Sequence, residues 1–194
     1  MSLDRGAAES LLFEWTEGKS LRAHARAVEA CMRAYARRFG EDEELWGITG
    51  LLHDLDYEKH PSQEEHPRIG CGILRKKGFP EPMLQAILGH AEYLDVPRES
   101  RMAQALFAVD ELVGLITAVA LVRPSKDIRE VKPKSVKKKW KDKAFARGVN
   151  RGDIERGAGE LGVPLDEHIA FSLDAMKAVS EELGLVGAGG AAGG

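Results

Sequence analysis

An adjacent histidine and aspartate, His53 and Asp54, follow the apolar pair Leu51 and Leu52. Both side chains can ligate a divalent cation, and apolar sequence on one side indicates partial burial. An ionised carboxylate is costly to bury unless it is paired, hydrogen-bonded or bound to a metal. A single His-Asp pair also arises by chance. Its weight depends on whether further histidine and aspartate residues occur at suitable places elsewhere.

Two further residues complete a ligand set. His24 lies between Leu21 and Val28 on or beside the apolar face of a predicted helix, where a lone histidine is more often a core residue than a ligand. Asp110 lies in a helix so apolar that its carboxylate either faces solvent or has a strong partner, and a cation would supply one. Two imidazoles and two carboxylates favour Mn, Fe, Co, Ni or Zn over Mg.

The order H…HD…D on consecutive predicted helices resembles the HD-domain superfamily of metal-dependent phosphohydrolases. The similarity runs from about His24 to Ala118, and the family motif corresponds to His24, His53, Asp54 and Asp110. The resemblance implies that these four residues hold a divalent transition metal. It also implies hydrolysis of a phosphomonoester or phosphodiester, nucleotide-like, by metal-activated water.

Two more histidines lie in segments that resemble the HDIG subgroup of this superfamily. His66 begins the segment HPRIG, and His90 lies within LGHAE. In members with two metals these positions hold the second ion and the HD aspartate bridges both, so the resemblance implies a second ion on His66, His90 and Asp54. The alternative is that His66 lies in a solvated loop and His90 contacts substrate. The chain departs from the subgroup after the pair, where Leu55 and Asp56 replace Ile-Gly.

The polar loop after the pair offers charged side chains for catalysis. A carboxylate there could accept a proton from water, and a basic side chain could hold a phosphate. Solvated loop charge is the more common role for any single one. The candidates are Asp54, Asp56 and Glu58 as catalytic carboxylates, and Lys59, Arg68 and His90 as substrate contacts. His60 and His168 have no such context and are expected on the surface.

Two other functions fit the same pattern. A few HD-fold proteins are oxygenases with a mixed-valent di-iron site, and their H…HD…H…H…D order resembles the one in this chain. A non-catalytic nucleotide-binding HD domain is the third hypothesis, although a degenerate domain would not need to retain all four core ligands.

Helices must position these residues, because helical periodicity dominates and no period-two alternation stands out. We predict an all-α, single-domain bundle of six to nine helices, of the HD-domain type. The predicted helices are 7–17, 20–39, 41–52, 68–77, 82–93, 100–122, 150–161 and 164–183, with one or two short ones before residue 150. The predicted segments are an N-terminal helix (1–19), the metal-binding core (20–122), a helical extension with a basic segment (123–186) and a flexible Gly/Ala tail (187–194).

Composition limits the partners and the compartment. The net charge of −3 gives no global attraction to nucleic acid or to an anionic membrane, and no apolar stretch approaches a membrane span of roughly 20 residues. The basic run 132–143, which includes Trp140, could bind nucleic acid or attract an anionic substrate, but a solvated helical face is the simpler interpretation. We therefore expect a small phosphorylated partner and neither a nucleic acid nor a membrane. Cys31 and Cys71 lie in no CxxC context and no signal peptide is evident, which favours the cytoplasm.

Overall fold

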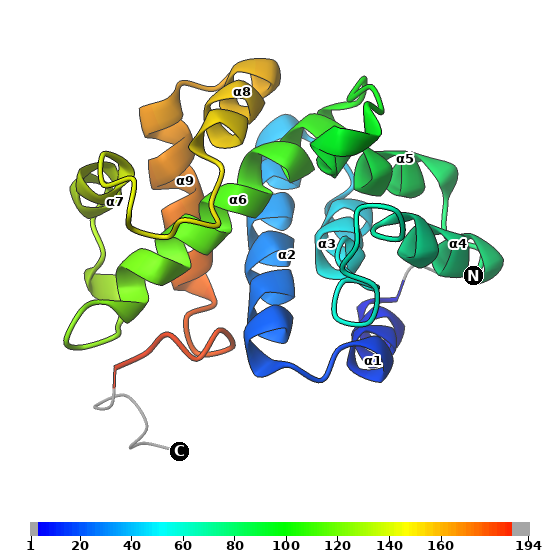
Figure 1. Cartoon of the computed structure of the whole chain (residues 1–194), viewed down its shortest axis with the longest axis horizontal. Helices are drawn as coiled ribbons and strands as arrows, with labels where there is room; N and C mark the ends of the chain where they lie inside the picture. The colour runs from blue at the N-terminus through cyan, green and yellow to red at the C-terminus, as the bar shows by residue number, and fades with distance from the viewer. Residues whose placement is uncertain (1–3, 188–194) are drawn as a thin grey trace.

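The computed structural model describes residues 4–187, and over that range the chain forms nine α-helices, two short 3-10 helices and no β-strand. This confirms the predicted all-α fold (Figure 1). The helices are α1 (Arg5–Trp15), α2 (Lys19–Phe39), α3 (Glu43–Leu52), α4 (Arg68–Lys76), α5 (Glu81–His90), α6 (Arg101–Leu121), α7 (Pro133–Trp140), α8 (Arg151–Leu161) and α9 (Leu165–Ala178), with η1 (Glu92–Leu94) and η2 (Ile128–Glu130) between them.

Local chemistry sets the helix ends, and several differ from the predicted ends. Helix α3 begins at Glu43 because the Asp42 carboxylate accepts hydrogen bonds from the backbone N–H groups of Glu44 and Leu45, both at 3.0 Å. Helix α5 ends at His90, since the following residue is extended. Helix α9 ends at Ala178, five residues before the predicted end, where the chain enters turns.

Helix α6 is the centre of the molecule. In Figure 1 it crosses the view diagonally, with α3, α4 and α5 on one side and α7, α8 and α9 on the other. It packs against α2, α5, α7, α8 and α9. Its length and composition would allow a membrane span, contrary to the sequence expectation, but 61% of its apolar window is buried inside the fold. The core of the protein therefore forms around the helix that carries Asp110.

Helices α2 and α3 approach closely, which brings His24 near the end of α3. A Cβ on Gly50 would lie only 3.0 Å from the backbone nitrogen of Glu29, so a larger residue would force the two helices apart. Glycine at this position lets the backbones touch. The end of α3, where His53 and Asp54 lie, is thereby fixed against α2.

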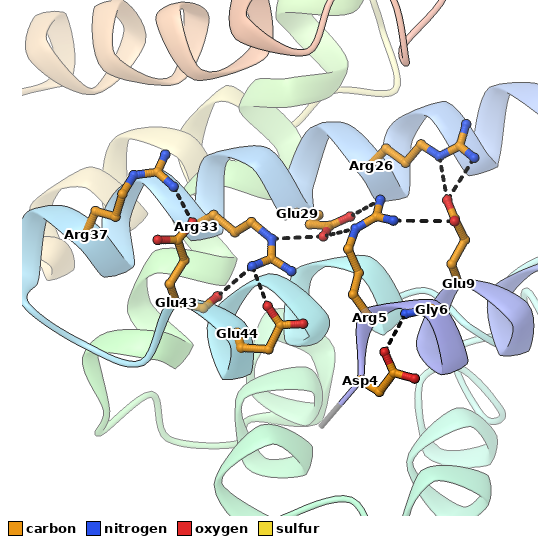
Figure 2. Close-up of polar contacts among 10 residues, drawn as sticks. All are labelled: Asp4, Arg5, Gly6, Glu9, Arg26, Glu29, Arg33, Arg37, Glu43 and Glu44. Atoms are coloured by element: carbon orange, nitrogen blue, oxygen red, sulfur yellow. Dashed lines mark hydrogen bonds and ion pairs between the residues drawn. The ribbon is translucent and has the colours of Figure 1, made fainter. Parts of the chain in front are cut away.

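A network of ion pairs joins the first three helices (Figure 2). The buried Glu29 of α2 accepts hydrogen bonds from Arg5 of α1 at 2.8 Å and from Arg33 at 2.9 Å, and Arg33 also donates to Glu44 of α3 at 2.8 Å. Because a buried carboxylate is costly without partners, the two arginines offset the desolvation of Glu29. Two further pairs on the same face are Glu9 with Arg26 and Arg37 with Glu43.

The residues after α6 pack directly on it. A Cβ on Gly157 of α8 would lie 2.6 Å from the Cα of Ala108, so α8 lies against the backbone of α6. His168 of α9 is fully buried, which corrects the expectation of a surface histidine. Its apolar helical spacing beside Ile169 and Leu173 carries it into the core. The predicted tail 187–194 lies outside the described residues apart from Gly187.

Candidate metal centre

Six predicted ligands come from five parts of the fold and meet at one place. His24 projects from α2, the adjacent His53 and Asp54 follow the last residue of α3, and Asp110 belongs to α6. Two histidines complete the set: His66 lies just before α4, and His90 is the last residue of α5.

The two oxygens of Asp54 face different histidines. Its Oδ2 lies 3.4 Å from Nε2 of His53 and 4.0 Å from Nε2 of His24. Its Oδ1 lies 3.4 Å from Nε2 of His66 and 3.5 Å from Nε2 of His90. Donor atoms at such separations suit the ligands of one ion on each side of the carboxylate. Asp54 therefore occupies the position of a bridge between two ligand groups.

Asp110 completes the first group. Its Oδ1 lies 2.9 Å from Nε2 of His24 and 3.4 Å from Nε2 of His53. These three side chains offer ligand atoms that all lie within 4.8 Å of one another, and the same holds for His53, Asp54 and His90. The sequence motif is thus assembled in space as a compact set of nitrogen and oxygen donors.

The ring orientations leave Nε2 free for an ion. His53 and His90 each donate a hydrogen bond from Nδ1 to the backbone carbonyl three residues earlier, and His66 donates from Nδ1 to the carboxylate of Asp56 at 2.8 Å. Since Nδ1 donates a hydrogen bond in each ring, Nε2 is the nitrogen that faces Asp54 and binds an ion once it is deprotonated. This is the hydrogen-bonded arrangement that orients histidine ligands in metal sites.

One buried atom shows that the donor set fits a cation. Nε2 of His53 is buried and has no hydrogen-bond partner within the described part of the chain. A buried nitrogen without a partner is costly, and here it faces two carboxylates. Imidazole nitrogens and carboxylate oxygens together suit a divalent transition metal. The residues present therefore fit the metal that the family resemblance implies.

The electrostatics of the metal-free centre point the same way. Burial opposes ionisation, but the facing imidazoles hold the pKa of Asp54 and of Asp110 well below the ordinary range of a carboxyl. Burial also disfavours a charged His53, yet the Asp54 and Asp110 carboxylates raise the pKa of His53 well above its usual value. Protons on imidazole therefore balance the carboxylates, and a divalent cation must displace them. Metal affinity should therefore decrease as the pH is lowered, because protons compete with the cation for the imidazoles.

A cavity of about 490 Å³ opens above the ligands. Its lining includes five carboxylates and, over residues 4–187, no lysine or arginine. Two of the five carboxylates, Glu92 and Asp153, form ion pairs with Arg156, which does not itself line the cavity. Asp54, Asp110 and the neighbouring Glu111 have no such cationic partner in this range. The cavity is therefore acidic unless cations bind in it.

Sequence reasoning missed three cavity residues. Glu111 accepts a hydrogen bond from the backbone N–H of Asn150 at 3.1 Å, and its burial together with the Asp110 charge raises the pKa of Glu111 to about 7. Tyr57 and Tyr93 are 42% and 44% exposed and line the same cavity. Glu111 could have been suspected from its place beside Asp110, but no pattern in the sequence marks the two tyrosines.

Asp56 lies outside the cavity, in contrast to the predicted catalytic role. It is fully buried and accepts hydrogen bonds from Nδ1 of His66 at 2.8 Å and from the backbone N–H of Gly70 at 2.6 Å. Both oxygens are engaged, so Asp56 orients His66 and does not face the reaction space. Most of the loop 56–67 is accessible to solvent, as expected, but Asp56, His66 and Pro67 are buried.

The other predicted loop residues also point away from the cavity, because tight turns after residue 52 send successive side chains in different directions. Glu58 accepts hydrogen bonds from the N–H groups of Glu17, at 2.6 Å, and Gly18, and so anchors the start of α2. Lys59 donates to the Glu14 carbonyl at 3.1 Å. Arg68 is exposed and donates to the carbonyls of residues 63 and 64. These three side chains do not reach the cavity as the structure describes it.

Comparison with known proteins agrees with the ligand geometry. The sequence profile of the HD domain matches residues 21–115. The chain is 30% identical over 105 residues to Ribonuclease Y of Syntrophobacter fumaroxidans, which covers 54% of this chain and 20% of that protein. It is 29% identical over 103 residues to Ribonuclease Y of Lactobacillus gasseri, which covers 53% of this chain and 19% of that protein.

The chain thus spans about a fifth of the length of these curated relatives. No solved structure gives a significant match. The matched residues include all six candidate ligands, which lie between positions 24 and 110. Residues 21–115 of this chain form an HD domain, a family that is generally made up of metal-dependent hydrolases.

Proposed function

We propose that this protein is a metal-dependent phosphodiesterase that acts on a nucleotide-containing diester and uses two divalent cations. The observation that carries the proposal is the placement of Asp54, whose two oxygens face separate histidine groups at the floor of an acidic cavity. His24, His53 and Asp110 would hold one cation with Asp54. His66 and His90 would hold the other.

The charge of the cavity favours a diester over a monoester. Asp54, Asp110 and Glu111 are the carboxylates without an arginine or lysine partner among the described residues. Above pH 7, where Glu111 is ionised, two divalent cations against these three leave about one net positive charge. A phosphodiester carries one negative charge, whereas a phosphomonoester carries about −1.5 to −2 near neutral pH. With no lysine or arginine lining the cavity among residues 4–187, the second charge of a monoester would have no partner.

Different residues of the chain would have different roles around a bound phosphate. Bound divalent cations supply Lewis-acid chemistry, neutralising phosphoryl oxygens and lowering the pKa of water. Asp54 is the one predicted catalytic carboxylate that lines the cavity, and its low pKa and its two facing ligand groups suit it to bridge the cations and not to accept a proton. Asp56 holds His66 in the required orientation from behind.

Two tyrosines support a nucleotide-containing substrate. Tyr93 donates a hydrogen bond from its hydroxyl to the His66 carbonyl at 2.8 Å, which fixes its ring beside the ligands. The ring of Tyr57 lies edge-on to His66, with centroids 5.2 Å apart. Exposed aromatic faces beside a phosphate site can stack on a nucleobase. The name of the relatives, Ribonuclease Y, points to the same class of substrate.

A comparison of two small esters tests the proposal. The full chain is stripped with a chelator, reloaded with manganese under anaerobic conditions, and assayed on bis(p-nitrophenyl) phosphate and on p-nitrophenyl phosphate. We expect a higher kcat/KM for the diester and loss of activity in Asp54→Ala. The exposed Asp174→Ala is the matched control and should leave the rate unchanged.

Equal or faster cleavage of the monoester would refute the charge argument. Full activity with manganese in the absence of oxygen excludes the di-iron oxygenase. If no ester is cleaved while a nucleotide still raises the melting temperature of the loaded protein, a binding domain would replace the enzyme as the better description.

A further inference from the structure

Charge is strongly segregated along this chain. The basic segment, defined as residues 132–147, contains seven lysines and one arginine against one aspartate, a net charge of +7 in a chain whose net charge is −3. It lies after the residues that match the HD domain, which end at 115. The expectation that nucleic acid is not a partner rested on the net charge of the whole chain. That average conceals the segment.

Most lysines of the basic segment are exposed and lack a counter-charge. Lys137 pairs with Asp166 at 2.7 Å, and Lys139 with its neighbour Asp142 at 3.8 Å. Lys134, Lys138 and Lys141 are exposed and form no ion pair with any residue that the structure describes. Like charges four residues apart on a helix, such as 134 and 138, destabilise it by some tenths of a kcal/mol. Such a cost is offset if a polyanion binds.

A hollow of about 360 Å³ lies between the basic helix α7 and α9. Trp140, Leu165 and Ile169 provide its apolar part, and four lysines surround them. An aromatic ring among basic side chains is the arrangement by which proteins bind single strands, with a base on the ring and phosphates on the lysines. A membrane-binding helix would instead present a row of exposed apolar side chains. The apolar Val136 of α7 is buried in the core.

The basic segment ends at the rim of the metal cavity. In Figure 1 the chain leaves α7, passes across α6 and enters α8. Just after the segment, the Asn150 N–H donates to Glu111, and Val149 lies 3.7 Å from the position of a Cβ on Gly114. Glu111 and Gly114 both line the cavity. Since the cavity itself has no lysine or arginine in the described range, the further phosphates of a polyanionic substrate must be bound on another surface.

We propose that the basic segment binds single-stranded nucleic acid and leads it from the Trp140 hollow to the metal cavity. The binding itself stands on the charge and shape of the segment, whereas delivery to the reaction rests on the proposed phosphodiesterase function. The strand would place one base against Trp140 and its phosphates along Lys134, Lys138 and Lys141.

Binding is tested with a triple variant, Lys134→Gln, Lys138→Gln and Lys141→Gln, in the full metal-loaded chain. The probe is a fluorescent 12-nucleotide phosphorothioate oligouridine, with affinity measured by anisotropy from 0.05 to 0.3 M salt. Each lost phosphate contact on a single strand reduces the salt slope by about 0.7, so three reduce it by roughly 2. The same relation gives a loss of affinity of about 100-fold at 0.1 M salt.

A second triple variant is the control for net charge. Lys76→Gln, Lys77→Gln and Lys126→Gln removes the same charge from exposed lysines elsewhere on the chain. It should leave both the affinity and the salt slope nearly unchanged. An equal loss in both triple variants would overturn the proposal, because only the overall field would then matter. Failure of the wild-type chain to bind the oligomer would overturn it directly.

Two further measurements identify the partner and separate this proposal from the proposed function. Tighter binding to vesicles with 30% phosphatidylserine, or to a duplex of the same length, would overturn a single-strand site. Hydrolysis of bis(p-nitrophenyl) phosphate should be the same in both triple variants and the wild type, which also shows that each is folded. Oligomer binding that depends on the three lysines, without hydrolysis of the small diester, would support this site while refuting the phosphodiesterase.

Discussion

Acidification should destabilise this protein through one buried imidazole, His168. Its side chain has no solvent exposure, Nε2 donates a hydrogen bond to the Ala108 carbonyl at 2.8 Å, and Nδ1 accepts one from the Tyr35 hydroxyl at 2.7 Å. The neutral ring satisfies both nitrogens, whereas a proton on Nδ1 would require the Tyr35 hydroxyl to turn and accept a hydrogen bond. Burial lowers the pKa of His168 to about 4, from an ordinary value of 6.5.

The sign and size of the effect follow from the two pKa values. Between pH 6.5 and about 4 the unfolded chain binds a proton at residue 168 and the native chain does not, so the free energy of unfolding falls as the pH falls. Each pKa unit corresponds to about 1.4 kcal/mol, which gives a loss of about 3 kcal/mol across this window. Above pH 6.5 the residue contributes no pH dependence.

Urea unfolding of the wild type and His168→Gln, both with chelator present, measures this contribution. At pH 7 the variant should be less stable by about 1–3 kcal/mol, since buried hydrogen bonds are lost. Toward pH 4 the wild type should lose about 3 kcal/mol more than the variant, which has no imidazole to titrate. A stability difference that stays constant from pH 7 to pH 4 would refute the reasoning.

Three other outcomes are expected. Asp54→Ala should lose all bound metal by elemental analysis and His90→Ala one ion per chain, and unchanged stoichiometry in His90→Ala would make that residue a substrate contact. Asp56→Asn should weaken metal binding by about 10- to 100-fold in a competition titration, since it removes support from a ligand without touching the ion. Gly157→Ala should cost about 1–3 kcal/mol in urea unfolding because its Cβ would lie 2.6 Å from α6. Gly159→Ala, where a Cβ meets open space, is the control and should stabilise α8 by up to about 1 kcal/mol.

The helices could be predicted from local patterns, and the ligands from the resemblance to the HD-domain superfamily. Apolar periodicity and capping residues gave most helix ends to within a few residues, and the H…HD…D order named residues that the structure places around Asp54. Helical spacing does not fix the direction of side chains in the turns from 53 to 60. That is why Asp56, expected in a solvated loop, is in fact buried behind His66.

Burial beyond the family motif was equally hard to predict. His168 stands beside two acidic residues, which suggests a surface position, but its helix packs against α2 and α6 with that face inward. The exposed tyrosines of the cavity, 57 and 93, belong to segments that meet only through tertiary packing. Such contacts join residues far apart in the chain, and no local pattern records them.

The extension after the HD match also helps to position the metal centre. Ala108 lies two residues before Asp110 on α6, and its carbonyl accepts the hydrogen bond from His168. The backbone of α8 lies against the same residue at Gly157, and Glu111 is held by the N–H of Asn150. Helix α6 is thus held by contacts with α8, α9 and Asn150 close to Asp110. Loosening this packing should shift Asp110 and weaken the binding of the cation that Asp110 and His24 would share.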